Sequence, residues 1–274
     1  MVRKSNISLA LDIILYLFTY MIIQIVCSGI CVLVFGTDNA SYIVYMQLTS
    51  SILTIALYVA LRWSSLFSSF DCDKPTIFFA SIVIFTIAEV FPTVWFIELT
   101  EAEIPKNMER IFEQLLSDPI GMLCVGIIVP ICEEVVFRGA ILGQMLKAFG
   151  GKKHWHAICI SALLFAIAHG NLAQGPHAFL LGILLGWLVY RTGSLVPGVV
   201  LHVVNNSLVL VPSLFGKVDT DDKLIDFFGG DATLMTIVII ISTLIALPSL
   251  WWLLKSTPDN TGRFTTDDNI TDVN

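Results

Sequence analysis

The stretch ICEEVVFRG, residues 131–139, places three ionisable side chains inside an otherwise apolar segment. A charged side chain near the centre of a bilayer costs roughly 2.5–3.5 kcal/mol on insertion scales, so such residues are functional candidates by default. On a helix, Glu134 and Arg138 lie one turn apart and can form an ion pair. Glu133 then lies about 100° around the helix, free to face another group. We therefore predict that Glu133 is the working carboxylate, with Glu134 and Arg138 in supporting roles.

The composition of the surrounding chain predicts a polytopic membrane protein. Of its 274 residues, 56% are hydrophobic and 14% are charged, and the mean hydropathy is +0.83. This composition is too apolar for a water-soluble domain. The six cysteines contain no CxxC pair, so we expect neither a disulfide framework nor a zinc-thiolate site. The lipid bilayer is the expected partner, and we expect no nucleic-acid binding.

Eight apolar segments of the chain are candidates for membrane helices. A helical structure is required because lipid cannot satisfy backbone polar groups, and the segments lack the alternation of barrel strands. We therefore predict an all-α fold of about eight transmembrane helices in one bundle, with the fifth and sixth helices short. The segments cover residues 8–36, 42–62, 76–97, 119–142, 156–170, 177–191, 194–213 and 233–254.

These segments divide the single bundle into four parts. Residues 1–118 hold three helices and an outer segment, 101–117, whose apolar period suits an interfacial helix. Residues 119–213 hold the candidate site, residues 214–258 an outer loop and the last helix, and residues 259–274 a polar tail that we expect to be disordered. Lys and Arg predominate in the loops on the side of the N-terminus, which predicts cytoplasmic termini in a cell membrane. The small size and compact loops indicate a bacterial source.

Two histidines in later apolar segments are expected at a depth similar to that of Glu133. His169 ends the fifth segment, and His202 lies in the seventh, on the same helical face as Asn206. At 1.5 Å per residue from the nearest basic loop, Glu133, His169 and His202 lie roughly 24 Å or less into the membrane. We therefore predict that their side chains form one site.

Two mechanisms of peptide-bond hydrolysis suit this set of side chains. In the first, Glu133 and His169 hold and deprotonate a water molecule. His202 and Asn206 then donate hydrogen bonds to the oxyanion of the tetrahedral intermediate. In the second, Glu133, His169 and His202 bind one divalent metal ion such as zinc, which lowers the pKa of its bound water. The sequence alone does not decide between these mechanisms.

Three short motifs occur in order along these segments: EExxxR at residues 133–138, FxxxH at 165–169 and HxxxN at 202–206. Together they resemble the CAAX protease and bacteriocin-processing family of intramembrane endopeptidases, also called the Abi family, over about residues 119–213. The resemblance implies an eight-helix bundle with a cavity that opens toward the cytoplasm. It also implies a peptide or membrane-protein substrate, and a role in bacteriocin processing, self-immunity or peptide-signal maturation. The implied catalytic group is Glu133, His169, His202 and Asn206, with Glu134 and Arg138 completing the first motif.

Two function classes compete with the endopeptidase hypothesis. The first is a non-catalytic membrane immunity or partner-binding protein that has kept the same fold. The second is an ion-coupled transporter, because ionisable residues near the midplane also mark ion paths, although no inverted repeat is evident. Among the remaining polar residues, we expect Asn171 and His177 to cap helices. Glu89 is a minor candidate for lining the cavity.

Overall fold

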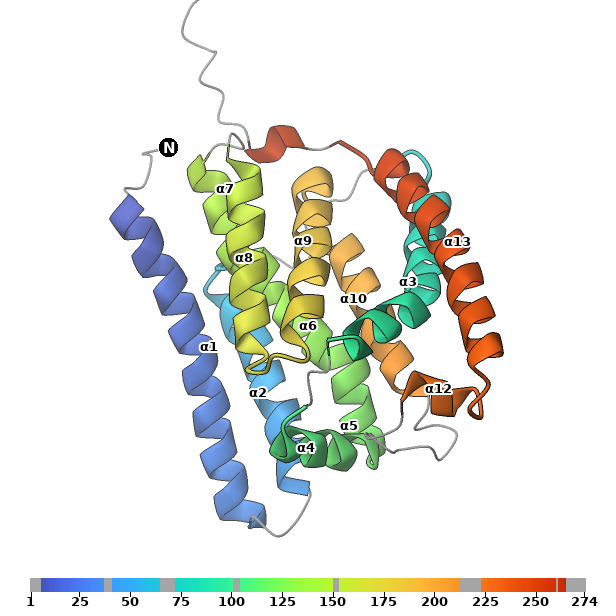
Figure 1. The fold of residues 1–274 in the computed structure, drawn as a ribbon. Helices are drawn as coiled ribbons and strands as arrows, with labels where there is room; N and C mark the ends of the chain where they lie inside the picture. Colours follow the sequence, from blue (N-terminus) through green and yellow to red (C-terminus); the bar gives the residue numbers. More distant parts are fainter. Residues whose placement is uncertain are drawn as a thin grey trace, which may run out of the picture.

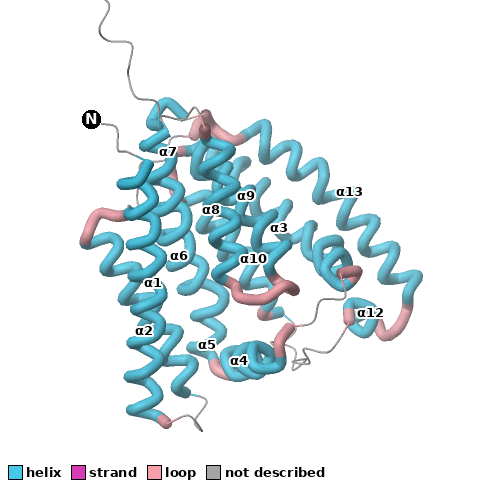
Figure 2. Tube along the Cα trace, turned by 60° about the vertical axis from the view of Figure 1, so that its left-hand side comes forward, coloured by secondary structure: helices cyan, strands magenta, loops and turns pink. Residues whose placement is uncertain are grey.

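The computed structural model describes residues 6–36, 41–64, 72–100, 104–149, 153–211, 223–259 and 261–264. These described residues form helices and contain no strand (Figure 2), which confirms the predicted all-α class. The predicted polar tail lies outside the described residues beyond residue 264.

All eight predicted apolar segments are helical. Five helical stretches are long and apolar enough to cross a membrane, whereas α8 and α10 are shorter apolar helices. Two helices differ in length from the prediction. The sixth helix was expected to be short, but α9 has 18 residues. The seventh was predicted over residues 194–213, but α10 has only 14 residues. The helices are α1 (Asn6–Phe35), α2 (Ser41–Ala60), α3 (Pro75–Glu98), the continuous run Pro119–Phe149, α8 (His154–Ala168), α9 (Gly175–Thr192), α10 (Val196–Val209) and α13 (Ala232–Ser256).

The run Pro119–Phe149 is a single helical path that changes its hydrogen-bonding register. Its start is capped by Asp118, whose carboxylate accepts from two backbone N–H groups, and proline occupies the first position. Two stretches are π-helical, a geometry often found at functional sites. The second stretch begins at Glu134, within the EExxxR motif. The successive segments are α5 (Pro119–Leu123), η1 (Cys124–Ile128), α6 (Val129–Glu133), η2 (Glu134–Leu142) and α7 (Gly143–Phe149).

The helices surround this run in two groups (Figure 1). α1 and α2 pack together on one side of the bundle, and α3 packs on α13 at the opposite edge. Between them, α8 packs against η2 and α9, and α10 contacts η1 and α6. The run Pro119–Phe149 is therefore covered from several directions, which places the EExxxR motif in the interior.

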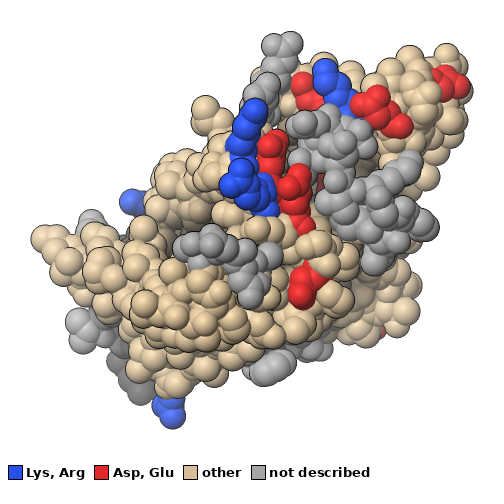
Figure 3. Space-filling model, turned by 90° about the horizontal axis from the view of Figure 1, so that it is seen from below, with Lys and Arg blue, Asp and Glu red and all other residues tan. Residues whose placement is uncertain are grey.

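The predicted interfacial helix forms α4 (Lys106–Leu116) and lies across the lower end of the bundle (Figure 1). Its Leu115 and Leu116 are buried, while Lys106 and Glu113 are exposed. Viewed from below, acidic and basic side chains gather near the middle of this end of the molecule (Figure 3). The helix thus presents an apolar face to the bundle, as its sequence period predicted. The short helices α12 (Leu224–Phe227) and η3 (Thr261–Phe264) complete the described chain.

Candidate active site

The predicted ion pair between Glu134 and Arg138 forms and is fully buried. Arg138 Nη1 lies 2.9 Å from Glu134 Oε1, and both side chains are 0% exposed. The guanidinium also stacks over the ring of Phe165, with Cζ 4.2 Å from the ring centroid, a favourable cation–π arrangement. A buried charge must be paired, so each group depends on the other to remain in the interior.

Two glycines make room for this buried pair. A Cβ atom on Gly182 of α9 would lie 3.2 Å from Arg138 Nη2, and one on Gly198 of α10 would lie 3.1 Å from Glu134 Oε2. Small residues at such positions let membrane helices approach closely. The backbones of α9 and α10 therefore lie directly against the two charges.

His202 joins the two neighbouring glutamates. Its Nδ1 lies 3.0 Å from Glu134 Oε1, and its Nε2 lies 3.5 Å from Glu133 Oε2. A carboxylate paired with arginine acts as an acceptor, so Nδ1 carries the proton that faces Glu134. The contact between His202 and Glu134 was not predicted. It gives Glu134 a second role, because this carboxylate fixes the orientation of the imidazole as well as balancing Arg138.

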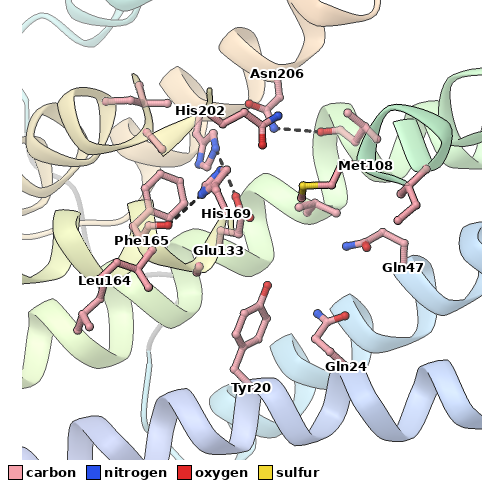
Figure 4. A pocket seen from close by; sticks show the side chains of 18 of the residues that line it. Tyr20, Gln24, Gln47, Met108, Glu133, Leu164, Phe165, His169, His202 and Asn206 are labelled. Carbon is pink, nitrogen blue, oxygen red and sulfur yellow. Dashed lines mark hydrogen bonds and ion pairs between the residues drawn. The ribbon is translucent and has the colours of Figure 1, made fainter. Parts of the chain in front are cut away.

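Glu133 faces a cavity, as its position on the helix predicted. Its side chain is 15% exposed, in contrast to the fully enclosed Glu134. The cavity has a volume of about 770 Å³, and its lining includes Glu133, His169 and His202. Figure 4 shows these three side chains converging from α6, the end of α8 and α10. The three side chains thus line one cavity, and their joint role as a site stays a prediction.

His169 is held at the end of α8 by the FxxxH spacing. Its Nδ1 lies 2.9 Å from the carbonyl oxygen of Phe165, one of the last carbonyls of the helix. A carbonyl only accepts, so Nδ1 donates and leaves Nε2 as an acceptor. The Phe165 ring meets both imidazoles edge-on, with centroids 4.7 Å from His169 and 5.7 Å from His202. Phe165 therefore spaces the two histidines and covers Arg138.

Asn206 also lines the cavity, and its amide is anchored on both sides. Its Nδ2 donates to the carbonyl of Val125 at 3.3 Å, and its Oδ1 accepts from Asn205 at 3.2 Å. The carbonyl is available because Pro130 has no N–H to donate one turn back along the helix. In the run Pro119–Phe149, the carbonyl of Gly126 likewise accepts a hydrogen bond from the hydroxyl of Ser207 at 3.4 Å. These bonds leave Asn206 one free N–H.

The comparisons with known proteins match the helices that carry this geometry. A family model described as type II CAAX prenyl endopeptidase Rce1-like covers residues 115–208, which contain all six predicted site residues. The match extends over about a third of the chain. The curated relatives that the chain matches are bacterial membrane proteins, and no solved structure matches it.

Two curated relatives of this chain come from bacteria. It is 28% identical over 134 residues to the membrane-embedded CAAX protease MroQ of Staphylococcus aureus strain USA300, covering 46% of this chain and 54% of the relative. It is 25% identical over 109 residues to the putative membrane peptidase YdiL of Bacillus subtilis strain 168, covering 40% and 43%. The chain therefore spans about half the length of the curated relatives it matches.

The side chains of this site do not form a set of metal ligands. Across the described residues, no group of three His, Cys, Asp or Glu side chains lies close enough together to hold one. Structural and catalytic zinc sites use three or four such ligands. Both ring nitrogens of His202 already face carboxylates, at 3.0 and 3.5 Å. The arrangement does not fit a three-ligand centre, and we derive no step through a metal.

Several polar residues of the cavity wall escaped the sequence analysis. His177 was expected to cap a helix but lines the cavity, whereas Asn171 does bond within its turn, to Gln174. Glu89 lines a different cavity, between α3, α9 and α13. The sequence does contain a signal for them, because each uncharged residue of this set is a polar side chain within or beside an apolar segment. The predictions relied on ionisable residues and therefore did not include them. The remaining polar lining consists of Tyr20, Gln24, Gln47, Gln174 and Asn205.

Proposed function

We propose that this protein is a membrane-embedded endopeptidase in which Glu133 activates the attacking water. The observation that carries the proposal is the contrast between two adjacent glutamates. Glu134 is fully buried between Arg138 and His202, while Glu133 reaches the cavity beside the imidazole. A general base must lie within reach of the proton it abstracts, and Glu133 has this access.

In the proposed reaction, Glu133 and the acceptor Nε2 of His169 hold one water molecule. Glu133 takes a proton from this water while the water oxygen forms a bond to the carbonyl carbon of the scissile peptide. The free N–H of Asn206 donates to the oxyanion that forms, a contribution typical of such donors. When the C–N bond breaks, the proton held by Glu133 passes to the departing amine.

His202 is proposed to assist this proton transfer. Its Nε2 lies 3.5 Å from Glu133 and shares the proton taken from water. The imidazolium that results is stabilised by Glu134, because Nδ1–H points at that carboxylate. Arg138 balances the charge of Glu134 in the interior. The EExxxR motif thus supplies both the base and the support for its partner.

The proposed substrate is a peptide or membrane protein cleaved within the bilayer region. The role that we propose, bacteriocin processing, self-immunity or peptide-signal maturation, rests on the resemblance of the three motifs. The two bacterial relatives support the broader class of membrane peptidase. The orientation with cytoplasmic termini is retained from the distribution of Lys and Arg.

The experiment is cleavage of a fluorogenic peptide pool by purified protein in lipid nanodiscs. Glu133→Gln, which keeps the shape of the side chain, is expected to lower kcat by about 10²–10⁴-fold, the usual contribution of a general base. Its melting temperature should stay near that of the wild type, because Glu133 is at the cavity surface. Full cleavage by this folded variant would overturn the proposal.

The same preparation tests the metal-free mechanism. Metal analysis of the active protein should find no stoichiometric zinc, and cleavage should persist after dialysis against a chelator. The expectation rests on the separation of the donor groups. Loss of cleavage with the chelator, restored by added zinc, would favour the metal mechanism instead.

A further inference from the structure

The wall opposite the proposed base carries uncharged polar side chains from the first two helices. Tyr20 and Gln24 lie one turn apart on α1, and Gln47 lies on α2. All three line the same cavity as Glu133. Figure 4 shows them on the far side of the cavity, with Glu133 and the two histidines across from them. None of the three belongs to the motifs that resemble the family.

These side chains are unusual in their setting. The outward face of α1 is apolar, with Ile14 and Phe18 each 60% exposed. An amide in such a helix is costly unless it finds a hydrogen-bonding partner. Among the described residues, the amide of Gln47 has no such partner, and Gln47 is only partly exposed. The amide of Gln24 hydrogen-bonds the side chain of Tyr20, which uses one of its three hydrogen-bonding groups. An amide that lines a cavity without a partner is available to a ligand.

The position of Tyr20 is fixed by packing against the catalytic helix. Its ring meets Phe137 of η2 edge-on, with centroids 6.2 Å apart. Phe137 is buried and lies four residues after Glu133 on the same helix. α1 is thereby held in register with the base, which keeps Gln24 at a constant height relative to Glu133.

We infer that Gln24 and Gln47 bind the main chain of the substrate in an extended conformation across from Glu133. This inference rests on the proposed peptidase function. A primary amide carries one acceptor and two donors, and so matches the C=O and N–H of a peptide group. A helical substrate has already used these groups within itself, whereas an extended one presents them. The substrate class is thus a segment that is unwound at the scissile bond.

The rest of the cavity lining supports recognition of this kind. Met108, Ile111 and Phe112 of α4 contribute apolar surface beside the glutamines. In the described chain, the cavity lining has Glu133 as its one carboxylate and includes no Lys or Arg. The cavity therefore offers main-chain partners and apolar contacts, and its described lining has no Lys or Arg to pair with an acidic side chain. We expect apolar residues next to the cleaved bond.

The test pairs a protein variant with a change in the peptide backbone. The probe is an apolar ten-residue fluorogenic peptide, together with analogues in which one amide near the scissile bond is replaced by an ester. Gln47→Leu and Gln24→Leu should each raise KM by about three- to tenfold, the effect of one hydrogen bond, with kcat nearly unchanged. For the wild type, an ester at the position facing the glutamine should raise KM similarly.

The decisive result is the combination of the two changes. If Gln47 binds that amide, the ester should cost Gln47→Leu nothing further, because the hydrogen bond is already absent. Fully additive losses at every ester position, or an unchanged KM in both variants, would overturn the inference. Gln144→Leu is the matched control, since this glutamine bonds Asp12 at 3.1 Å and does not line the cavity. It should lower the melting temperature without changing KM.

The inference and the proposed function fail in different ways. The affinity of the same labelled peptide for Glu133→Gln protein measures the contribution of Gln24 and Gln47, here called the glutamine wall, without any cleavage. If wild type cleaves no peptide, the proposed function fails, yet weaker binding after Gln47→Leu still supports the wall. If wild type cleaves and Gln47→Leu binds the peptide as tightly as its parent, the wall alone is wrong.

Discussion

The run Pro119–Phe149 and helix α13 have almost the same mean hydropathy, 2.2 and 2.3, but opposite surroundings. In the most apolar window, 56% of the residues of the run are buried inside the protein, against 11% for α13. The run is enclosed by other helices, while α13 packs mainly on α3 at the edge of the bundle (Figure 1). Hydropathy therefore shows that both belong in a membrane and says nothing about which one faces protein.

The difference lies in residue size and charge pairing. The run approaches its neighbours closely at glycine positions, and Arg138 and Glu134 pair within it. Helix α13 contains no glycine and presents large aliphatic side chains such as Leu244, which is 66% exposed. Lipid is as apolar as leucine, so burial of such side chains in protein brings little gain. The two regions should respond very differently to substitution.

The largest expected effect on stability is in the enclosed run. Arg138→Met leaves the buried Glu134 without the charge that balances it, which should lower the free energy of unfolding by about 3–5 kcal/mol. Denaturant unfolding in detergent micelles measures this loss. The double variant Arg138→Met with Glu134→Met removes both charges and should recover most of it. A single variant as stable as wild type would show that the pair is not isolated from water.

A smaller effect is expected where α9 touches α8. Gly182→Leu adds a side chain whose Cβ would lie 3.0 Å from Ala162 Cα, so the helices must separate at a cost of about 1–3 kcal/mol. Cleavage should fall as well, since α8 carries His169. Gly182→Ala is the graded comparison and should show less of both effects. Equal melting temperatures for all three proteins would mean that the contact between these helices is loose.

The smallest effect is expected on α13. Leu244→Ala at its lipid-facing surface should change the free energy of unfolding by no more than about 0.5 kcal/mol. Cleavage should also be unchanged, because Leu244 lines neither cavity. A loss comparable to that of Gly182→Leu would indicate that this surface contacts protein, and would erase the contrast between the two regions.

The sequence by itself determined the features that depend on local spacing. Eight apolar segments specify helices because lipid leaves no other way to satisfy the backbone. The pairing of Glu134 with Arg138 follows from one helical turn, as does the exposure of Glu133 on another face. The pairing of Asn206 with Val125 is different, because it needs a carbonyl freed by Pro130 on another helix.

Only the tertiary structure decided how groups from separate helices meet. His202 reaches Glu134 across 68 residues of chain, and no spacing rule predicts which nitrogen faces which carboxylate. The glutamines of α1 and α2 face the site because those helices pack beside η2. Uncharged polar residues in apolar helices have the same local pattern whether they face lipid, a neighbouring helix or a cavity. Their role depends on the packing of distant segments, which the spacing within one helix does not specify.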